Sequence, residues 1–272
     1  MTILRLIFTL FLLTSLPIIS VGQQPTASSQ TDAIQHIVST IPFNEMLEES
    51  PRDLHQQFSQ NPFGLPPSQN EKMMEIFLET FTTDTLSEHI RQTFEDSIDK
   101  KHAQSVNEWL SQEKNQPLIN AEKEYYTIEG IRKRVVNRYE MEQDPPSAER
   151  KELLSNLAQT KSATEMELET QVILFRSLVK AFGILNTQRT LSDAQIEGFV
   201  SNFRNQAQSQ IEREITQKLM VQFYGIDNEL IRDYQSFYES EAGRWLSQTT
   251  AEALKSAYQK ASDEFLQSIE NL

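Results

Sequence analysis

The chain has 272 residues, no cysteine and a formal net charge of −14, with 39 acidic side chains against 25 basic ones. Such an acidic surface repels phosphate backbones and anionic lipid headgroups, which argues against nucleic-acid binding and adhesion to an acidic membrane. The lack of cysteine excludes a disulfide framework, so stability must come from burial. At this length we expect one large or two small domains.

The first 22 residues have the layout of a secretory signal peptide. Arg5 gives a positive start, an uncharged apolar run extends from Leu6 to Ile19, and the small residues Ser20 and Gly22 precede the expected cut. The alternative is an uncleaved anchor, but a run of about 14 residues is shorter than the roughly 20 needed to cross a bilayer. We therefore expect cleavage after Gly22 and an exported chain without stable membrane insertion. The periplasm is the expected location, with secretion as the alternative.

Composition predicts an all-α fold. Glycine is scarce, and the Asn-Gly and Asp-Gly pairs typical of hairpin turns are absent. Leu, Glu, Gln, Ala, Lys and Arg dominate, and all of them are good helix formers. We expect a flexible polar tether over 23–30, and then helices over 31–40, 69–82, 84–97, 147–160, 163–185 and 192–224, followed by helices that start after Asp227 and Ser240.

Prolines, glycines and capping residues mark where these helices should end. Pro42 and Pro51 punctuate the segment after the first helix, and three prolines with one glycine make 61–67 a loop. Gly225 should stop a long helix that opens with a capping box at Ser192–Gln195. Three further residues are placed to cap helices through their side chains: Ser147, Asp227 and Ser240.

The break at 141–147, which contains Pro145 and Pro146, separates two predicted helical modules, 31–140 and 148–272. The modules share an apolar pattern at a shift of 128 residues, in which Ile98 matches Ile226, Trp109 matches Phe237 and Leu118 matches Leu246. Any two amphipathic helices can share such spacing, so chance is the alternative. The common helix–break–helix order favours an internal duplication.

The second module carries a family resemblance over about residues 215–265. Glu229-Leu230, Phe237-Tyr238, Ser240 and Gly243 stand where the domain-of-unknown-function 2059 family has its most regular positions, although Glu241 replaces the usual proline. The segment resembles this family of exported bacterial helical domains. The resemblance implies an exported α-helical module and supplies no catalytic residues.

The same motif has the chemistry of a helix corner. Ser240 can cap the next helix, and Gly243 falls in its first turn, where the missing side chain lets another backbone approach closely. At the matching position the first module has Asn115 instead of a glycine. The alternative is an interaction site, in which Phe237, Tyr238 and Trp245 form the wall of an apolar groove between the modules.

A basic patch stands out in the acidic chain. Its residues are Arg132, Lys133, Arg134 and Arg138, and three tyrosines lie nearby at Tyr125, Tyr126 and Tyr139. One interpretation is that the patch grips an anionic ligand or an acidic partner helix. The other is that it balances neighbouring carboxylates within the chain, namely those of Glu122, Glu124, Glu129 and Glu140.

The chain contains no catalytic or metal-binding motif that we recognise, and its four histidines have no partners at helical spacing. We expect His89 to lie on the surface and His102 at the edge of the core. We therefore predict a non-enzymatic protein without cofactor or metal, which interacts with another envelope protein or peptide. Two alternatives stay open: an unrecognised hydrolase with a carboxylate or serine site, and a chaperone-like peptide-binding protein.

Overall fold

The structure is a computed structural model that describes residues 27–41, 43–97, 99–186 and 191–272. The predicted leader, its cleavage site and Ile98 lie outside these residues. The described part contains twelve α-helices, one short 3-10 helix and no strand, which confirms the all-α prediction.

The helices follow one another with short connections. They are α1 (Ala27–Thr40), α2 (Phe43–Phe58), α3 (Pro67–Thr80), α4 (Thr83–Asp96), α5 (Lys100–Leu110), η1 (Glu113–Asn115), α6 (Gln116–Glu124), α7 (Ile128–Gln143), α8 (Ala148–Thr160), α9 (Ala163–Leu185), α10 (Asp193–Gln222), α11 (Asn228–Glu239) and α12 (Glu241–Glu270).

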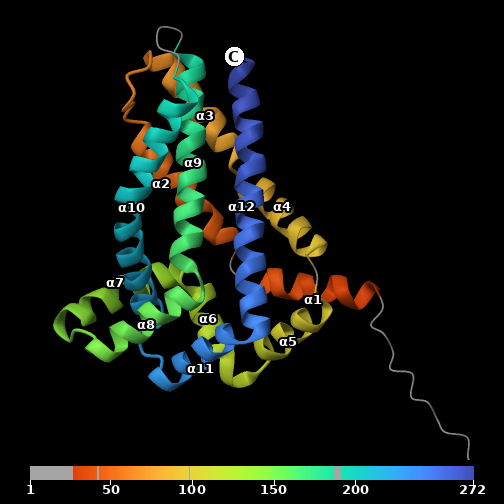
Figure 1. The fold of residues 1–272 in the computed structure, drawn as a ribbon. Helices are drawn as coiled ribbons and strands as arrows, with labels where there is room; N and C mark the ends of the chain where they lie inside the picture. Colours follow the sequence, from red (N-terminus) through yellow and green to blue (C-terminus); the bar gives the residue numbers. More distant parts are fainter. Residues whose placement is uncertain (1–26, 42, 98, 187–190) are drawn as a thin grey trace, which may run out of the picture.

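Three long helices form the frame of the molecule. Helix α9 lies between α10 and α12 and packs against both, while α3, α4 and α5 pack against α12 (Figure 1). Helices α5 to α8 and α11 gather around one end of this frame, and the carboxyl terminus of α12 lies at the other end (Figure 1).

One main hydrophobic core runs through the molecule from Ile34 to Ile269 and contains buried residues of both predicted modules. A smaller cluster joins α9 to α10, with Val172 and Val200 among its members. The apolar positions of α4 that are spaced by fours, Leu86, Ile90 and Phe94, are all buried. The core therefore continues across the break between α7 and α8, whereas the internal duplication stays a prediction.

Two expectations about the amino-terminal region need correction. Helix α1 begins at Ala27, so residues 27–30 of the segment expected to be a flexible tether are helical, because packing of the carboxyl-terminal half of α1 extends the helix backwards by one turn. Residues 23–26 of that segment lie outside the described residues. Helix α2 continues through Pro51, which was expected to break the chain. Leu47, Leu54 and Phe58 are buried along α2, and their burial offsets the roughly 3 kcal/mol cost of a proline in a helix.

The carbonyl that Pro51 leaves without an amide partner is satisfied from another helix. A proline has no N–H, so the carbonyl of Leu47, four residues earlier, loses its usual helical hydrogen bond. The hydroxyl of Tyr258 in α12 donates to this carbonyl at 3.2 Å. The proline site of α2 is thereby joined to the buried face of α12.

Most predicted helix ends are confirmed. The side chain of Ser147 accepts from the Arg150 amide, and the Ser192–Gln195 capping box is complete. The loop over 61–67 ends where α3 starts at Pro67, and Gly225 has a φ of +80°. Asp227 occupies the cap position of α11 but makes no side-chain cap hydrogen bond, so that part of the expectation is wrong.

The corner between α11 and α12 has the predicted construction. Ser240 accepts from the Gly243 amide at 3.1 Å and donates to the Phe237 carbonyl at 2.6 Å. A Cβ on Gly243 would lie 2.1 Å from the Phe237 carbonyl oxygen, so no side chain fits there. Close backbone approach is therefore the reason for glycine at this position.

A second corner of the same construction joins α6 to α7. Thr127 accepts from the Gly130 amide at 3.0 Å and donates to the Glu124 carbonyl at 2.8 Å. A Cβ on Gly130 would lie 1.7 Å from that carbonyl oxygen. The corner glycine of the first half is thus Gly130, while Asn115 is buried and donates to the Trp109 carbonyl.

No helix in the described part of the chain is long and apolar enough to cross a membrane.

Candidate functional site

A cavity lies where α2, α9, α10, α11 and α12 meet, close to the end of α6. It holds about 150 Å³ of space, and most of its wall is apolar. The apolar part of the wall comes from Ile41, Leu47, Ala163, Met166, Ile215, Leu219, Leu246 and Leu254. These helices meet with their apolar faces, and several residues of the wall are half-buried, so the cavity is partly open to solvent.

A buried ion pair forms one side of the cavity. Lys161, at the end of α8, pairs with Glu122 of α6 at 2.5 Å, and both side chains are about 15% exposed (16% and 15%). The hydroxyl of Tyr234 donates to Glu122 at 2.9 Å and lies 3.2 Å from the Lys161 ammonium. Tyr238 follows one turn later on α11, so both rings face Lys161, at 4.8 and 4.9 Å from their centroids.

Electrostatics keep Lys161 charged. Burial lowers the pKa of Lys161, but the Glu122 carboxylate and the Tyr238 hydroxyl together raise it above its ordinary value. Burial and Glu122 also raise the pKa of Tyr234 well above its ordinary value. Lys161 is therefore a fixed cation at neutral pH, and not a nucleophile or a general base.

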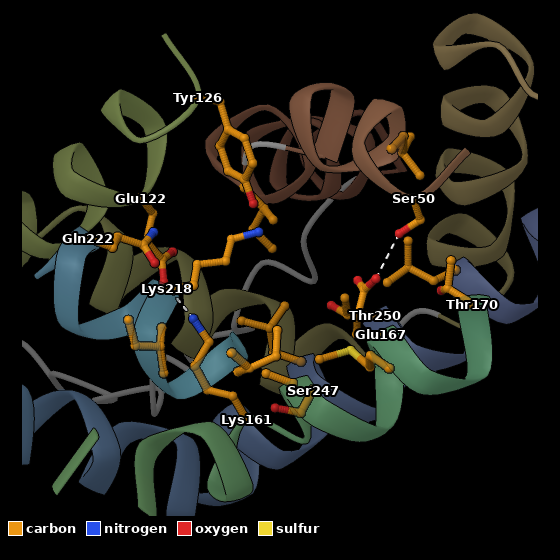
Figure 2. Close-up of a pocket in the computed structure, with 18 of the residues that line it drawn as sticks. Ser50, Glu122, Tyr126, Lys161, Glu167, Thr170, Lys218, Gln222, Ser247 and Thr250 are labelled. Atoms are coloured by element: carbon orange, nitrogen blue, oxygen red, sulfur yellow. Dashed lines mark hydrogen bonds and ion pairs between the residues drawn. The ribbon is translucent and has the colours of Figure 1, made fainter. Parts of the chain in front are cut away.

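A second polar group faces the cavity from the opposite side. Ser50 of α2 is 4% exposed and donates to a carboxylate oxygen of Glu167 of α9 at 2.8 Å. Gln171, one turn along α9, donates to the same oxygen at 2.7 Å. Figure 2 shows this pair and the Lys161–Glu122 pair at opposite ends, with apolar side chains between them.

The hydroxyl of Ser247 lacks a hydrogen-bond partner among the described residues. Ser247 lies on α12, is 7% exposed and belongs to the cavity wall. A buried hydroxyl without a partner costs roughly 1–3 kcal/mol, so Ser247 leaves an unrelieved polar atom in the wall of the cavity. Within the described wall, this hydroxyl is the clearest mark of a place for a bound molecule.

Lys218 and Tyr126 complete the polar end of the site. The Lys218 ammonium lies 4.9 Å from the centroid of the Tyr126 ring and 5.3 Å from that of Tyr125. Figure 2 shows Tyr126, Lys218 and Glu122 on the same side of the cavity. Two lysines, Lys161 and Lys218, thus stand with Glu122 at one end of the cavity, and Ser50 and Glu167 stand at the other.

The predicted corner residues separate in the structure. Tyr238 lines the cavity, whereas Phe237 is buried and stacks on Trp109 with a centroid distance of 4.3 Å. Trp245 stacks on His102 at 6.2 Å. Ser240 and Gly243 form the helix corner, so these five residues do not make up one groove wall.

The predicted basic patch also separates, because a helix turns successive residues to different sides. Lys133 pairs with Glu124 at 2.5 Å, and the Arg134 guanidinium lies 4.4 Å from the centroid of the Tyr125 ring. Arg132 and Arg138 are exposed, and Arg132 pairs with Glu129 at 3.5 Å. Charge balance within the chain therefore accounts for Arg132 and Lys133, and a ring contact accounts for Arg134.

Two of the histidines, His89 and His102, lie among packed helices. His102 lies at the core edge, as expected, with its side chain 24% exposed. His89 is 19% exposed and both of its ring nitrogens are shielded from solvent, so the expectation of a surface position is wrong. The reason is that α12 packs across α4 and covers this position. No group of three metal-ligating side chains occurs in the described residues.

Sequence reasoning missed the cavity residues because they come together only through the fold. Glu122 and Lys161 are 39 positions apart, and Glu122 and Tyr234 are 112 apart. The sequence does place Lys161 between two helices with apolar faces, 147–160 and 163–185, and this position could have indicated that its side chain lies near the core. No local pattern indicated Ser247, which lies within the apolar periodicity of α12.

No family model, curated protein or solved structure matches this chain. The resemblance to the domain-of-unknown-function 2059 family therefore stays a prediction that rests on the quoted residues.

Proposed function

We propose that the protein is an exported, non-catalytic binding protein whose cavity receives an apolar group of its ligand. The observation that carries the proposal is the unpartnered Ser247 hydroxyl in an apolar cavity of about 150 Å³. Apolar cavities of this size in other proteins take up groups such as a benzene ring. The export part of the proposal rests on the leader residues.

The charged groups around the cavity favour binding over catalysis. Lys161 is bound by Glu122 and two tyrosines, and its raised pKa denies it the role of a base or nucleophile. Lys161, Lys218 and Glu122 at one end suit a ligand with an apolar body and a polar end. A chaperone-like function is less well supported, because holding a peptide segment requires an open apolar groove larger than this cavity.

The test measures binding of two small probes by calorimetry: toluene, which is purely apolar, and hexanoate, which adds a carboxylate. Ser247→Leu fills the cavity and removes the unpartnered hydroxyl. We expect this variant to lose at least about tenfold in affinity while its melting temperature is kept or raised. Ser247→Ala is the matched control, since it removes the hydroxyl but leaves the space and should still bind toluene.

Two results would overturn the proposal. One is that neither probe binds the wild-type protein. The other is that Ser247→Leu binds toluene as well as wild type does, because the cavity would then not be the site.

A hydrolase is the second candidate, and the Ser50–Glu167 hydrogen bond at the cavity wall favours it. A carboxylate that accepts the serine proton is a minimal nucleophile–base pair. Turnover of an ester substrate that disappears in Ser50→Ala, with the fold intact by circular dichroism, would establish this function. Unchanged turnover in Ser50→Ala would exclude the pair as its source.

A further inference from the structure

Glu167 of α9 is a half-buried carboxylate in the cavity wall that has no cation beside it. Its neighbours Glu165 and Glu169 both lie close to Arg204, at 3.8 and 2.5 Å. Two positions along an α-helix correspond to a rotation of about 200°, so Glu167 faces away from that arginine and toward the cavity. Among the described residues, no lysine, arginine or histidine forms an ion pair with Glu167.

Two neutral donors hold one oxygen of this carboxylate. The Ser50 hydroxyl donates to Oε1 at 2.8 Å, and the Gln171 side-chain amide donates to the same atom at 2.7 Å. A carboxylate offers about four acceptor positions on its two oxygens. Within the described part of the chain, no side chain or backbone amide donates to Oε2. The carboxylate is therefore fixed in place with acceptor capacity left over.

The other charged groups of the cavity lie at its opposite end. Lys161 is held by Glu122 at 2.5 Å, and the Lys218 ammonium lies 4.9 Å from the centroid of the Tyr126 ring. Figure 2 shows Glu167 beside Ser50, away from this group. The end of the cavity at Glu167 thus carries a negative charge without a counter-charge, in a chain whose net charge of −14 attracts cations.

The Ser247 hydroxyl is independent evidence that this space receives a ligand. It lies in the same wall, its residue is 7% exposed, and it has no hydrogen-bond partner among the described residues. A hydroxyl accepts hydrogen bonds as well as donating them, so it can bind an N–H group. The unpartnered hydroxyl and the uncompensated carboxylate are both satisfied by a ligand that donates hydrogen bonds.

We infer that the ligand of this cavity is an amine, in which a small apolar body carries one protonated amino group that Glu167 binds through Oε2. This inference deepens the proposed function and rests on it. An ammonium N–H that donates to a carboxylate forms a charge-assisted hydrogen bond, roughly twice as strong as a neutral one. The apolar wall covers the rest of the ligand, and about 150 Å³ accommodates a body of the size of a benzene ring. A ligand with an anionic group at this end would be repelled by Glu167.

The experiment compares three probes with the same ring by calorimetry at neutral pH: benzylamine, which is protonated, benzyl alcohol, which is a neutral donor, and toluene. We expect the wild-type protein to bind benzylamine at least about tenfold more tightly than benzyl alcohol. Glu167→Gln keeps the size of the side chain and an acceptor for Ser50 but removes the charge. This variant should bind benzylamine at least about tenfold more weakly than wild type and toluene within about twofold of it.

Two further variants serve as controls. Glu169→Gln removes a carboxylate from the same helix outside the cavity wall, so it should change the affinity for benzylamine by less than about twofold. Ser247→Leu fills the cavity and should lose benzylamine binding together with toluene binding. The melting temperature of each variant shows that its fold is kept.

The outcomes separate this inference from the proposed function. Equal affinity of wild type for benzylamine and benzyl alcohol would overturn the amine assignment, and so would equal benzylamine affinity of wild type and Glu167→Gln. Toluene binding would uphold the proposed function in both cases. Benzylamine binding that survives Ser247→Leu would also overturn the assignment, because the amine would then lie outside the cavity. If none of the three probes binds wild type, the proposed function fails and the amine assignment fails with it.

Discussion

Gly243 and Gly130 occupy the same position in two helix corners. Together they show how far a glycine at a fixed distance from a helix cap predicts close backbone approach. A glycine three residues after a serine or threonine cap predicts close backbone approach, and the Gly243 corner confirms it. The pattern at Thr127–Gly130 is equally local. The shift of 128 residues that paired Gly243 with Asn115 obscured it, because the two corners are 113 positions apart.

Substituting these glycines should separate packing from helix propensity. Gly243→Ala and Gly130→Ala should each destabilise the protein by about 1–3 kcal/mol, since each new Cβ meets a carbonyl oxygen of the preceding helix. Gly198 is the control: it lies within α10 with nothing within 4 Å of its Cβ position, so Gly198→Ala should stabilise by up to about 1 kcal/mol. Urea unfolding of the three variants measures these changes. Equal effects at all three sites would mean that the corners are not tight.

The buried tyrosine hydroxyls predict a loss of stability in alkali. Burial and Glu122 raise the pKa of Tyr234 well above the ordinary 10.0, and burial raises that of Tyr258. Above pH 10 the unfolded chain releases these protons while the folded chain retains them. The contribution of these two tyrosines to the free energy of unfolding is therefore constant below pH 10 and falls as the pH rises further.

Urea unfolding between pH 9 and 11 tests the sign and the source. Tyr258→Phe removes one titrating hydroxyl, so its stability should fall less steeply with pH than that of wild type, by up to about 1.4 kcal/mol per pH unit. An identical slope in both proteins would show that Tyr258 titrates equally in the folded and unfolded states.

At the scale of whole elements, the sequence predicts most helix ends but not what each helix packs against. The Ser192–Gln195 box, the Ser147 cap and the extent of α9 follow from local rules and are confirmed. Pro51 departs from the expectation because tertiary contacts outweigh local preference. Burial along α2 offsets the cost of the proline.

The link between α2 and α12 gives a double-mutant prediction. Tyr258→Phe leaves the Leu47 carbonyl buried without a donor, which should cost about 1–3 kcal/mol. Pro51→Ala restores an amide that can donate to the same carbonyl, so in the Tyr258→Phe background it should recover most of the loss. The two changes should therefore be non-additive by about 1 kcal/mol or more in a thermodynamic cycle measured by urea unfolding. Additive effects would mean that the Tyr258 hydroxyl does not stand in for the missing amide.

At the scale of the molecule, the site could not be predicted because it depends on which distant helices meet. Lys161, Glu122 and Tyr234 are ordinary residues in their own segments, and only the packing of α6, α8 and α11 makes them one buried cluster. The all-α class, in contrast, follows from composition alone, since scarce glycine and absent hairpin signals leave helices as the only regular structure. The predicted two modules lie between these cases: the break at Pro145–Pro146 is present, but buried residues on both sides share one core.

That shared core leads to a prediction about cooperativity, which the two tryptophans can test. Trp109 lies in the first predicted module and stacks on Tyr234 and Phe237 of the second, while Trp245 in the second stacks on His102 of the first. Because each indole packs across the predicted boundary, loss of either module should expose both, and the chain should unfold in one transition. The variants Trp109→Phe and Trp245→Phe each leave one indole as a fluorescent reporter. In each variant the urea midpoint from fluorescence should coincide with the midpoint from far-ultraviolet circular dichroism. A fluorescence midpoint that departs from the circular dichroism midpoint in either variant would show that the modules unfold independently, and the continuous core would then not couple them.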